Sequence, residues 1–492
     1  MEFLNFFQQI TCIEDLIVIS YGYIHSEFNA MKEHQYEPTK YLEIQEAISI
    51  FFDILEYDEM NALQTLKSSI KELYLKEKFG FFHYYCIIRT IDSYYNYVNR
   101  SAYMGFEKFN KYRTLCKIFD ESKIVVIPKC NNSLISIFDK ALKEKEKLNG
   151  EKKVGLRKTL PYDKNNINTY LKNLILLHKE EIKEEIIIHE YVSSKFQNND
   201  FIKIIANRKS IKIVLVPITL KVFDEIFQFE IDDKSFWIKK IKKEEETIIA
   251  QLYIDVIKYY SNKDVDFIVF PEMFLNKNIL EKVREYLESN SIEKEQIYIL
   301  GSEWADFSNK MVLITSDGEV IYEQYKKIPF EKGKLEEKLL KDDNVINIMD
   351  FFGIGRINTF ICRDITDDKL MSIPKIVGTN LIITPAYTQS LNMKQIAKSL
   401  AANNICTTIL ANSCSARYDL SCIKQEKEIG FICQHLKKGT ESDCKVLNYK
   451  FDEQCQECDF NCYGFLVEIK YDEVLSSQEK TFATKIIKIL SK

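Results

Sequence analysis

The second part of this chain alternates short apolar runs, rich in β-branched residues, with longer amphipathic stretches. KIVLVPI at 212–218 and VDFIVFPE at 265–272 have the composition of buried strands. EEETIIAQLYIDVIKYY, which lies between them, is typical of a helix. Strands that alternate with helices form sheets covered by helices, so this pattern predicts a layered α/β domain.

The first 200 residues follow a different pattern. Leu63, Leu66, Ile70 and Leu73 recur at steps of three and four residues, which indicates one face of an amphipathic helix. An earlier set, Ile44, Ile48, Phe51 and Leu55, has the same spacing. Two runs, IVVIP at 124–128 and EIIIHEYV at 185–192, are β-branched enough to be strands. This region is therefore predicted to be a mainly helical α+β domain.

With 492 residues, the chain is longer than a single hydrophobic core usually grows. We predict an N-terminal domain over 1–200, a second domain over 205–475 and a C-terminal tail over 476–492. The polar stretch SSKFQNND, which ends at Asp200, is the predicted linker, because the periodicity changes after it. The charged run KALKEKEKLNGEKK is interpreted as a solvated helix and turn.

Composition and charge exclude several classes of protein. The chain has 46% hydrophobic and 29% charged residues, as in ordinary globular proteins. Its net charge of -5 argues against nucleic acid or an acidic membrane as the main partner. The first residues lack a basic segment and a cleavage site, and no run of about 18 apolar residues occurs. We therefore predict a cytoplasmic protein.

Three segments of the second domain each end a predicted strand with a reactive side chain. DFIVFPEMF leads into Glu272 directly after a proline, which cannot continue a central strand. MVLITSDGEVIYEQYKKIPF turns at an Asp-Gly pair and returns to Lys326 and Lys327. GRINTFICRD brings Cys362 to the end of an apolar strand.

A thiol, a carboxylate and an ammonium at three strand ends suit covalent acyl transfer. The carboxylate takes the thiol proton, the sulfur attacks an electrophilic carbon, and the lysine stabilises the charge that develops. Each residue by itself also has a structural explanation. A strand cysteine can be a small core residue, a glutamate after proline can be a cap, and paired lysines can protect an edge strand.

Taken together, the strings FPEMF, YKKIPF and FICRD resemble the signatures of the nitrilase, or carbon–nitrogen hydrolase, superfamily, in that family's order. IKIVLVPI, GTNLIITPA and AANNICTTILANS resemble its flanking segments, with Asn404 and Asn412 at familiar places. The resemblance covers about 208–472. It implies a nitrilase-type four-layer α-β-β-α sandwich, and usually a dimer, so we expect a homo-oligomer.

The activity that this resemblance implies is hydrolysis of a non-peptide C–N bond in a small amide, carbamoyl or related molecule. Cys362 would be the nucleophile and form a thioester, or a thioimidate from a nitrile, and Glu272 would be the general base. Lys327 is preferred over Lys326, because the family's lysine is the second residue after the aromatic, here Tyr325. No cofactor is required.

Two further roles follow from the resemblance. Lys327 and the backbone N–H of Arg363 would form the oxyanion site. Many members also have a second glutamate soon after the lysine, which could be Glu336 or Glu337, and we favour Glu336. The segment ITDDKL replaces the family's usual aromatic-Pro-Glu element after the nucleophile. This difference alters the wall of the pocket, so the resemblance does not specify the substrate.

A group of cysteines near the end of the chain is a second candidate site. Cys433, Cys455, Cys458 and Cys462 have spacings that could hold structural zinc. Only one close CxxC pair is present, so we favour unligated cysteines in a loop insertion.

Two other functions compete with the hydrolase. The N-terminal region could bind a protein partner and regulate the second domain, as in multidomain sensor and effector proteins of prokaryotic stress or phage defence. A pseudoenzyme is the other alternative, and the intact glutamate, lysine and cysteine count against it.

Overall fold

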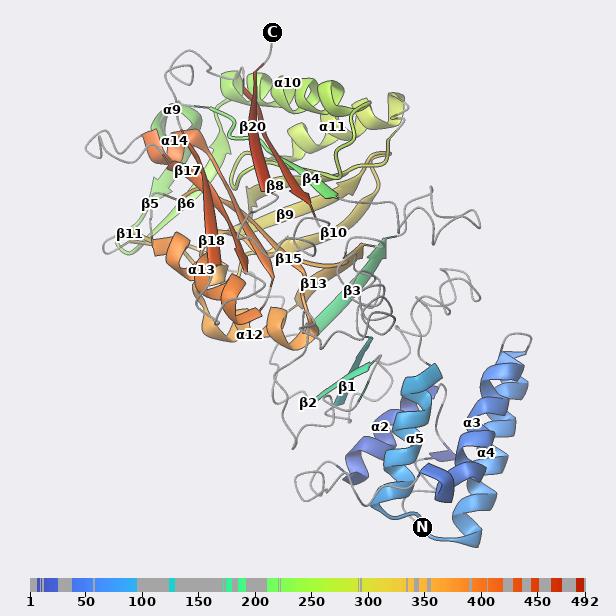
Figure 1. Ribbon diagram of the computed structural model, residues 1–492. Coiled ribbons are helices and arrows are strands. Elements are labelled where there is room, and N and C mark those ends of the chain that lie inside the picture. Colours follow the sequence, from blue (N-terminus) through green and yellow to red (C-terminus); the bar gives the residue numbers. More distant parts are fainter. Residues whose placement is uncertain are drawn as a thin grey trace, which may run out of the picture. The chain divides into compact units, whose positions relative to one another are not determined.

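The chain forms two compact units in the computed structural model (Figure 1): unit 1 comprises Met1–Asn132 and Arg157–Lys183, and unit 2 comprises Ser133–Leu156 and Glu184–Lys492. The structure describes residues 7–8, 10, 13–24, 38–55, 58–94, 124–128, 171, 174–178, 185–191, 210–219, 221, 223–290, 292, 294–332, 335–339, 345–351, 355–388, 392–404, 406–418, 428–435, 444–450, 462–470 and 484–490. Within these ranges, no helix is long and apolar enough to cross a membrane.

Unit 1 contains helices and a small sheet. Its described elements are α2 (Ile13–Ile24), a 3-10 helix η3 (Pro38–Tyr41), α3 (Leu42–Leu55), α4 (Glu59–Lys76), α5 (Phe81–Tyr94), β1 (Ile124–Pro128) and β2 (Leu174–His178). The predicted apolar faces lie on α3 and α4, and Ile48, Leu66 and Ile70 are fully buried in a core shared with α2 and α5. Helix α4 begins after Asp58, whose side chain accepts the N–H of Asn61.

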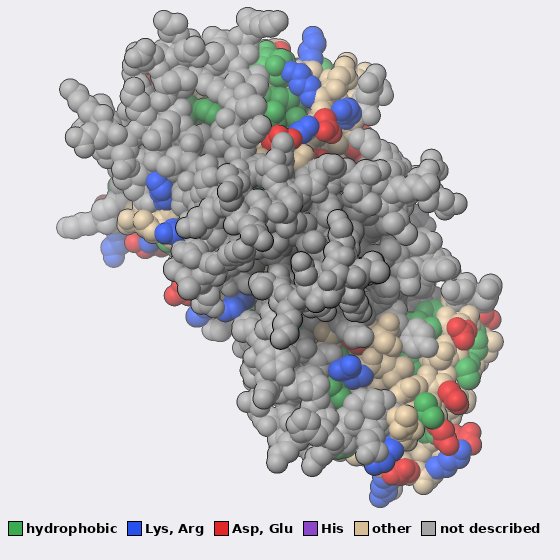
Figure 2. Space-filling view, in the orientation of Figure 1, with side chains coloured by type: hydrophobic (Ala, Val, Ile, Leu, Met, Phe, Trp, Pro, Cys, Tyr) green, Lys and Arg blue, Asp and Glu red, His purple; other side chains and the backbone are tan. Residues whose placement is uncertain are grey.

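The exposed faces of the unit-1 helices combine charged side chains of both signs with a few hydrophobic ones, such as Met60 and Leu75. Lys76 lies within ion-pair distance of both Glu43 and Glu72. Figure 2 shows blue and red side chains interspersed over the visible helical surface of this unit. These exposed pairs contribute little to stability, so unit 1 is held together mainly by its buried apolar faces.

The first large sheet of unit 2 has seven strands in the order β10-β9-β8-β7-β4-β19-β20. Their bounds are β4 (Ser210–Leu215), β7 (Phe267–Val269), β8 (Ile297–Ala305), β9 (Ser308–Thr315), β10 (Val320–Tyr325), β19 (Cys462–Lys470) and β20 (Thr484–Leu490). Strands β4, β7 and β8 are parallel, and β8, β9 and β10 are antiparallel. The predicted hairpin is confirmed, with Gly318 at a positive φ of 84° in its turn.

Two helices cover this first sheet, α10 (Lys243–Tyr260) and α11 (Lys277–Ser289). The buried residues of both helices form one apolar core with those of β4, β7, β8 and β9. Helix α11 begins after Asn276, whose side chain accepts the N–H of Ile279. This cap starts the helix soon after the strand exit that carries Glu272.

The second large sheet has the order β18-β17-β16-β15-β14-β13-β3. Its strands are β3 (Glu185–Tyr191), β13 (Val345–Phe351), β14 (Gly355–Thr359), β15 (Leu381–Ala386), β16 (Thr407–Asn412), β17 (Glu428–His435) and β18 (Cys444–Lys450). Helix α12 (Asp368–Val377) packs against α13 (Asn392–Asn404), which lies on β16 and β17, and a short helix α14 (Cys414–Tyr418) follows β16.

The two large sheets contact each other directly. The ring of Phe267 in β7 lies 5.4 Å from that of Phe351 in β13, centroid to centroid. The Tyr322 hydroxyl in β10 forms a 2.8 Å hydrogen bond with that of Thr359 in β14. Strand ends from both sheets can therefore contribute to one site.

A third, four-stranded sheet has the order β11-β12-β6-β5. Its strands are β5 (Phe227–Ile231), β6 (Ser235–Ile241), β11 (Glu331–Lys332) and β12 (Leu335–Glu337), and the short helix α9 (Phe223–Ile226) precedes β5. Strand β12 runs parallel to β6. The segment that follows Lys327 is therefore held by the β5-β6 hairpin, which lies about a hundred residues earlier in the chain.

Two predicted boundaries differ from the structure. Strand β3, which we assigned to the N-terminal domain, is an edge strand of unit 2 and pairs parallel with β13. Strand β20 lies in the predicted C-terminal tail, but it pairs with β19 in the first large sheet. An edge strand needs only one neighbour, and that neighbour can come from anywhere in the chain. The predicted linker at 193–200 and the charged run at 140–153 lie outside the described residues.

Candidate functional site

Cys362 lies at a strained turn directly after the second large sheet. Strand β14 ends at Thr359, and a 3-10 helix, η7 (Cys362–Thr366), begins with the cysteine. The backbone of Cys362 has a φ of 45°, a left-handed conformation that residues with a side chain rarely adopt. Its surroundings must hold it there, as is common for residues at functional sites. The residue is 3% exposed.

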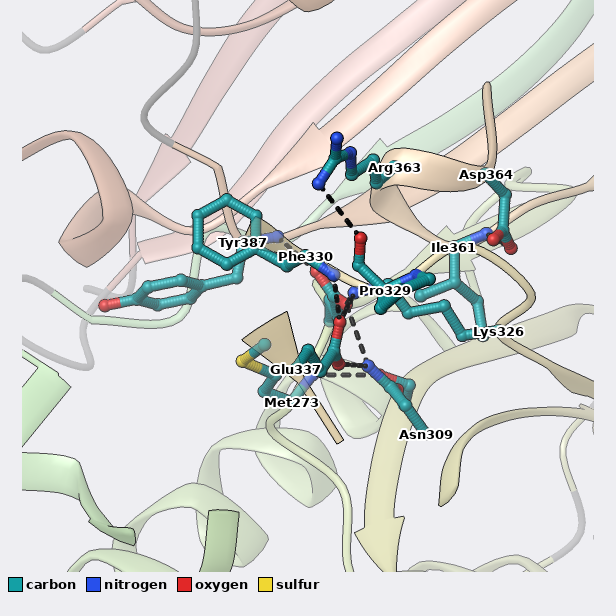
Figure 3. A network of polar contacts seen from close by, with 12 residues as sticks. Met273, Asn309, Lys326, Pro329, Phe330, Glu337, Ile361, Arg363, Asp364 and Tyr387 are labelled. Carbon is teal, nitrogen blue, oxygen red and sulfur yellow. Dashed lines mark hydrogen bonds and ion pairs between the residues drawn. The ribbon is translucent and has the colours of Figure 1, made fainter. Parts of the chain in front are cut away.

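Asp364 connects this turn to the lysine segment. Its carboxylate accepts hydrogen bonds from the backbone N–H groups of Ile361 (3.1 Å), Lys327 (2.9 Å) and Ile328 (2.8 Å). Figure 3 shows Asp364 beside Ile361. Burial raises the pKa of Asp364 to about 7, although the three N–H groups and the charge of Lys326 oppose that shift. The cysteine turn and the chain after β10 are thereby held in one arrangement.

The lysine that reaches the site is Lys326, and the prediction of Lys327 for this place is not what the structure shows. The side chain of Lys326 is fully buried, and its Nζ donates to Glu272 Oε1 at 2.8 Å and to Glu337 Oε2 at 2.6 Å. Side chains alternate along a strand, and Tyr322 and Gln324 in β10 are buried on the same side. Lys327 is half-buried, and its backbone N–H is the group that bonds to Asp364.

The second glutamate of the site also differs from the prediction. Glu337, not the favoured Glu336, reaches the site and is 2% exposed, whereas Glu336 is exposed. Glu337 Oε2 also accepts the backbone N–H of Phe330 at 2.8 Å. Strand β12 lies next to β6, and this pairing turns every second residue of β12 inward.

Glu272 lies at the centre of the polar network and is completely buried. Its Oε1 accepts from Lys326 Nζ and from Asn309 Nδ2 (2.9 Å), and its Oε2 accepts the backbone N–H of Tyr387 (2.9 Å). Lys326 directly follows β10, Asn309 lies in β9, and Tyr387 directly follows β15. Figure 3 shows the side chains of Asn309 and Glu337 joined within this network.

Asn309 was missed in the sequence. Its Nδ2 also donates to Glu337 Oε1 at 3.1 Å, so one amide contacts both carboxylates. The available signal was a polar residue at an inward position of the strand SNKMVLIT, two residues before the buried Met311.

Burial and charge set the protonation of the lysine and the thiol. Burial alone would lower the pKa of Lys326, but the charges of Glu272 and Glu337 outweigh it and raise that pKa above its ordinary value. Burial raises the pKa of the Cys362 thiol well above its usual range. The charge of Glu272 and a hydrogen bond to it add to this shift, while Lys326 opposes it. At neutral pH the site therefore holds a lysine ammonium and a protonated cysteine thiol.

The side chain of Arg363 is directed toward the neighbouring loop. Its Nη1 donates to the carbonyl oxygen of Pro329 at 3.1 Å, as Figure 3 shows, and its Nη2 lies 3.2 Å from a carboxylate oxygen of Glu331. The backbone N–H predicted for the oxyanion site directly follows Cys362 in the chain, and its role stays a prediction.

The remaining predicted residues lie elsewhere. Cys433 is buried in β17, whereas Cys455 and Cys458 lie outside the described residues, and only the backbone of Cys462 is described. Among the described residues, no group of three or more His, Cys, Asp or Glu side chains could hold a metal ion. Asn412 bonds to backbone groups of Thr388 and Ile429, which fits a structural role.

Sequence comparisons found no relatives. No family model matches the chain, and no curated protein matches it.

Solved structures do match, over about half of the chain. Nit3 of Saccharomyces cerevisiae, a member of branch 10 of the nitrilase superfamily, is 16% identical. That match covers 51% of this chain and 92% of Nit3, with a TM-score of 0.34. An amidase from Nesterenkonia sp. is 12% identical over 51% of this chain and 94% of its own, with a TM-score of 0.34. The NitFhit protein of C. elegans is 20% identical over 42% and 52%, with a TM-score of 0.31. The solved structures that this chain matches thus include members of the nitrilase superfamily.

Proposed function

We propose that unit 2 is a carbon–nitrogen hydrolase of the nitrilase type, which cleaves a non-peptide C–N bond in a small amide, carbamoyl compound or related molecule. Cys362 is the nucleophile, Glu272 the general base, Lys326 the cationic partner and Glu337 the residue that orients the lysine. The observation that carries this proposal is the fully buried Lys326 ammonium between the carboxylates of Glu272 and Glu337, close enough to the buried Cys362 thiol for their charges to interact.

The arrangement of unit 2 supports the same proposal. The two seven-stranded sheets contact each other, α10 and α11 pack on the first, and α13 packs on the second. These contacts support the four-layer α-β-β-α sandwich that the sequence motifs imply. Within it, Glu272, Lys326 and Cys362 all follow strand ends.

The first half of the reaction begins with a protonated thiol. Because the pKa of Cys362 is raised, the thiol gives up its proton to Glu272 as its sulfur attacks the carbonyl carbon of the substrate. The negative charge on the substrate oxygen is stabilised by the Lys326 ammonium and the backbone N–H of Arg363. Glu272 then returns the proton to the leaving nitrogen, the C–N bond breaks, and the acyl group remains on sulfur as a thioester.

The second half reverses these roles with water. Glu272 takes a proton from a water molecule, whose oxygen attacks the thioester carbon, and the same cationic groups stabilise the oxyanion. The C–S bond breaks, the sulfur regains its proton, and the acid product leaves. Lys326 remains an ammonium throughout, because the two carboxylates favour its charged form.

Intact-protein mass spectrometry tests the nucleophile. The wild-type protein is incubated with formamide, acetamide, benzamide and N-carbamoylglycine, and ammonia release and mass increases are recorded. We expect ammonia release with at least one compound and an acyl adduct on the peptide that contains Cys362. Cys362→Ala should abolish both.

Cys414→Ala is the matched control, because Cys414 is another buried cysteine of unit 2. It should retain both ammonia release and the adduct. Full ammonia release by Cys362→Ala would refute the proposed mechanism.

A further inference from the structure

Asn309 contacts every charged residue that the proposed reaction uses to activate the thiol. It lies in β9 and is 1% exposed. Its Nδ2 donates to Glu272 Oε1 at 2.9 Å and to Glu337 Oε1 at 3.1 Å. Its backbone oxygen accepts the N–H of Lys326 at 2.8 Å. The side chain thus joins the two carboxylates, and the backbone aligns the lysine between them.

The other end of this amide has no comparable role. The Oδ1 of Asn309 is buried, and no described residue donates a hydrogen bond to it. A buried acceptor without a donor is unfavourable, and leucine would fill nearly the same volume without that disadvantage. The amide is therefore not explained by packing alone, whereas its two N–H groups each have a carboxylate partner.

We propose that Asn309 is a positioning residue that holds Glu272 ionised and aimed at Cys362. This inference rests on the proposed function of the site. Two carboxylates that share one lysine repel each other, and an amide with two hydrogens can bond to both at once. With Asn309 in place, Glu272 Oε1 receives two donors and Oε2 one, so the orientation of the carboxylate is determined from both sides.

The experiment measures how fast iodoacetamide alkylates Cys362 as a function of pH, with peptide mass spectrometry as the readout. This probe needs no knowledge of the substrate. Wild type is compared with Asn309→Leu and Asn309→Asp, and the thermal midpoint of each variant is recorded. Removal of an N–H donor disfavours a carboxylate's ionised form. We therefore expect the acidic limb of the pH–rate profile for Cys362 alkylation to move to higher pH by about one unit in Asn309→Leu. In Asn309→Asp, which adds a third carboxyl group, the limb should move further.

Asn380→Leu is the matched control. Asn380 is also a buried asparagine of unit 2, and its Oδ1 accepts the backbone N–H of Arg356 at 2.8 Å. Its loss should lower the thermal midpoint without moving the pH profile of Cys362.

The proposal is overturned if both Asn309 variants keep the wild-type pH profile, or if Asn380→Leu moves it equally. Because Asn309→Asp keeps the shape of the side chain, it provides the comparison if Asn309→Leu does not fold. A wild-type protein that releases no ammonia from any amide would sink the proposed function, yet a shifted alkylation profile would still assign the positioning role to Asn309.

Discussion

Replacement of Lys326 by methionine tests the central feature of the site. The side chains of Lys326, Glu272 and Glu337 have no exposed surface, and the lysine's Nζ is 2.8 and 2.6 Å from the two carboxylates. Its removal leaves two buried carboxylates without their cation, which typically costs about 3–5 kcal/mol of folding free energy. For a unit of this size, the thermal midpoint should fall on the order of 10 °C.

The loss should depend on pH in a defined direction. Without the ammonium, both carboxylates are harder to ionise in the folded protein than in the unfolded chain. Groups whose folded pKa is raised favour the folded state at low pH and destabilise it as pH rises. The stability difference between wild type and Lys326→Met should therefore be smaller at about pH 5 than at about pH 8.

The assay pairs thermal unfolding with ammonia release and Cys362 alkylation. We expect Lys326→Met to lose activity by about 10²–10³-fold, as when an oxyanion donor is removed. Lys327→Met is the control. Its side chain is half-buried and should change stability by no more than about 0.5 kcal/mol.

A double variant separates stability from catalysis. Lys326→Met with Glu337→Gln removes one of the two stranded charges, so it should recover part of the lost stability without recovering activity. If Lys327→Met abolishes activity while Lys326→Met retains it, the assignment of the lysine is wrong.

Two further predictions concern the neighbouring residues. Glu337→Gln should lower the rate of ammonia release by about 10²-fold, because Lys326 loses a charged partner. Glu336 is exposed, so Glu336→Gln should leave that rate unchanged. Equal effects of the two substitutions would contradict the structure. Gly301→Ala should destabilise unit 2 and reduce activity, since Gly301 has a φ of 74° and an added Cβ would lie 2.0 Å from the carbonyl oxygen of Pro271, next to the general base. Gly80→Ala, where a Cβ meets nothing within 4 Å, should leave the thermal midpoint and the activity nearly unchanged.

The sequence by itself predicted several of the regular elements and two of the candidate site residues. Apolar periodicity predicted the helices around Ile48 and Leu66, the strands of both sheets near the reactive strings, and the hairpin before the lysines. These patterns depend on local backbone geometry, so they can be read in a short window. Glu272 and Cys362 were proposed on a different basis, because each directly follows a strand in a string that resembles a signature of the nitrilase superfamily.

The tertiary structure alone decided which lysine and which glutamate complete the site. Lys326 and Lys327 are neighbours directly after β10, and Glu336 and Glu337 are neighbours in β12, yet only Lys326 and Glu337 are buried in the site. The inward side depends on the strand's neighbours, and for β12 that neighbour is β6, about a hundred residues earlier.

Strands β3 and β20 joined the sheets through the same kind of distant pairing. Asn309 gained its role only when the fold placed a carboxylate at each hydrogen of its amide, because long-range contacts leave no local pattern.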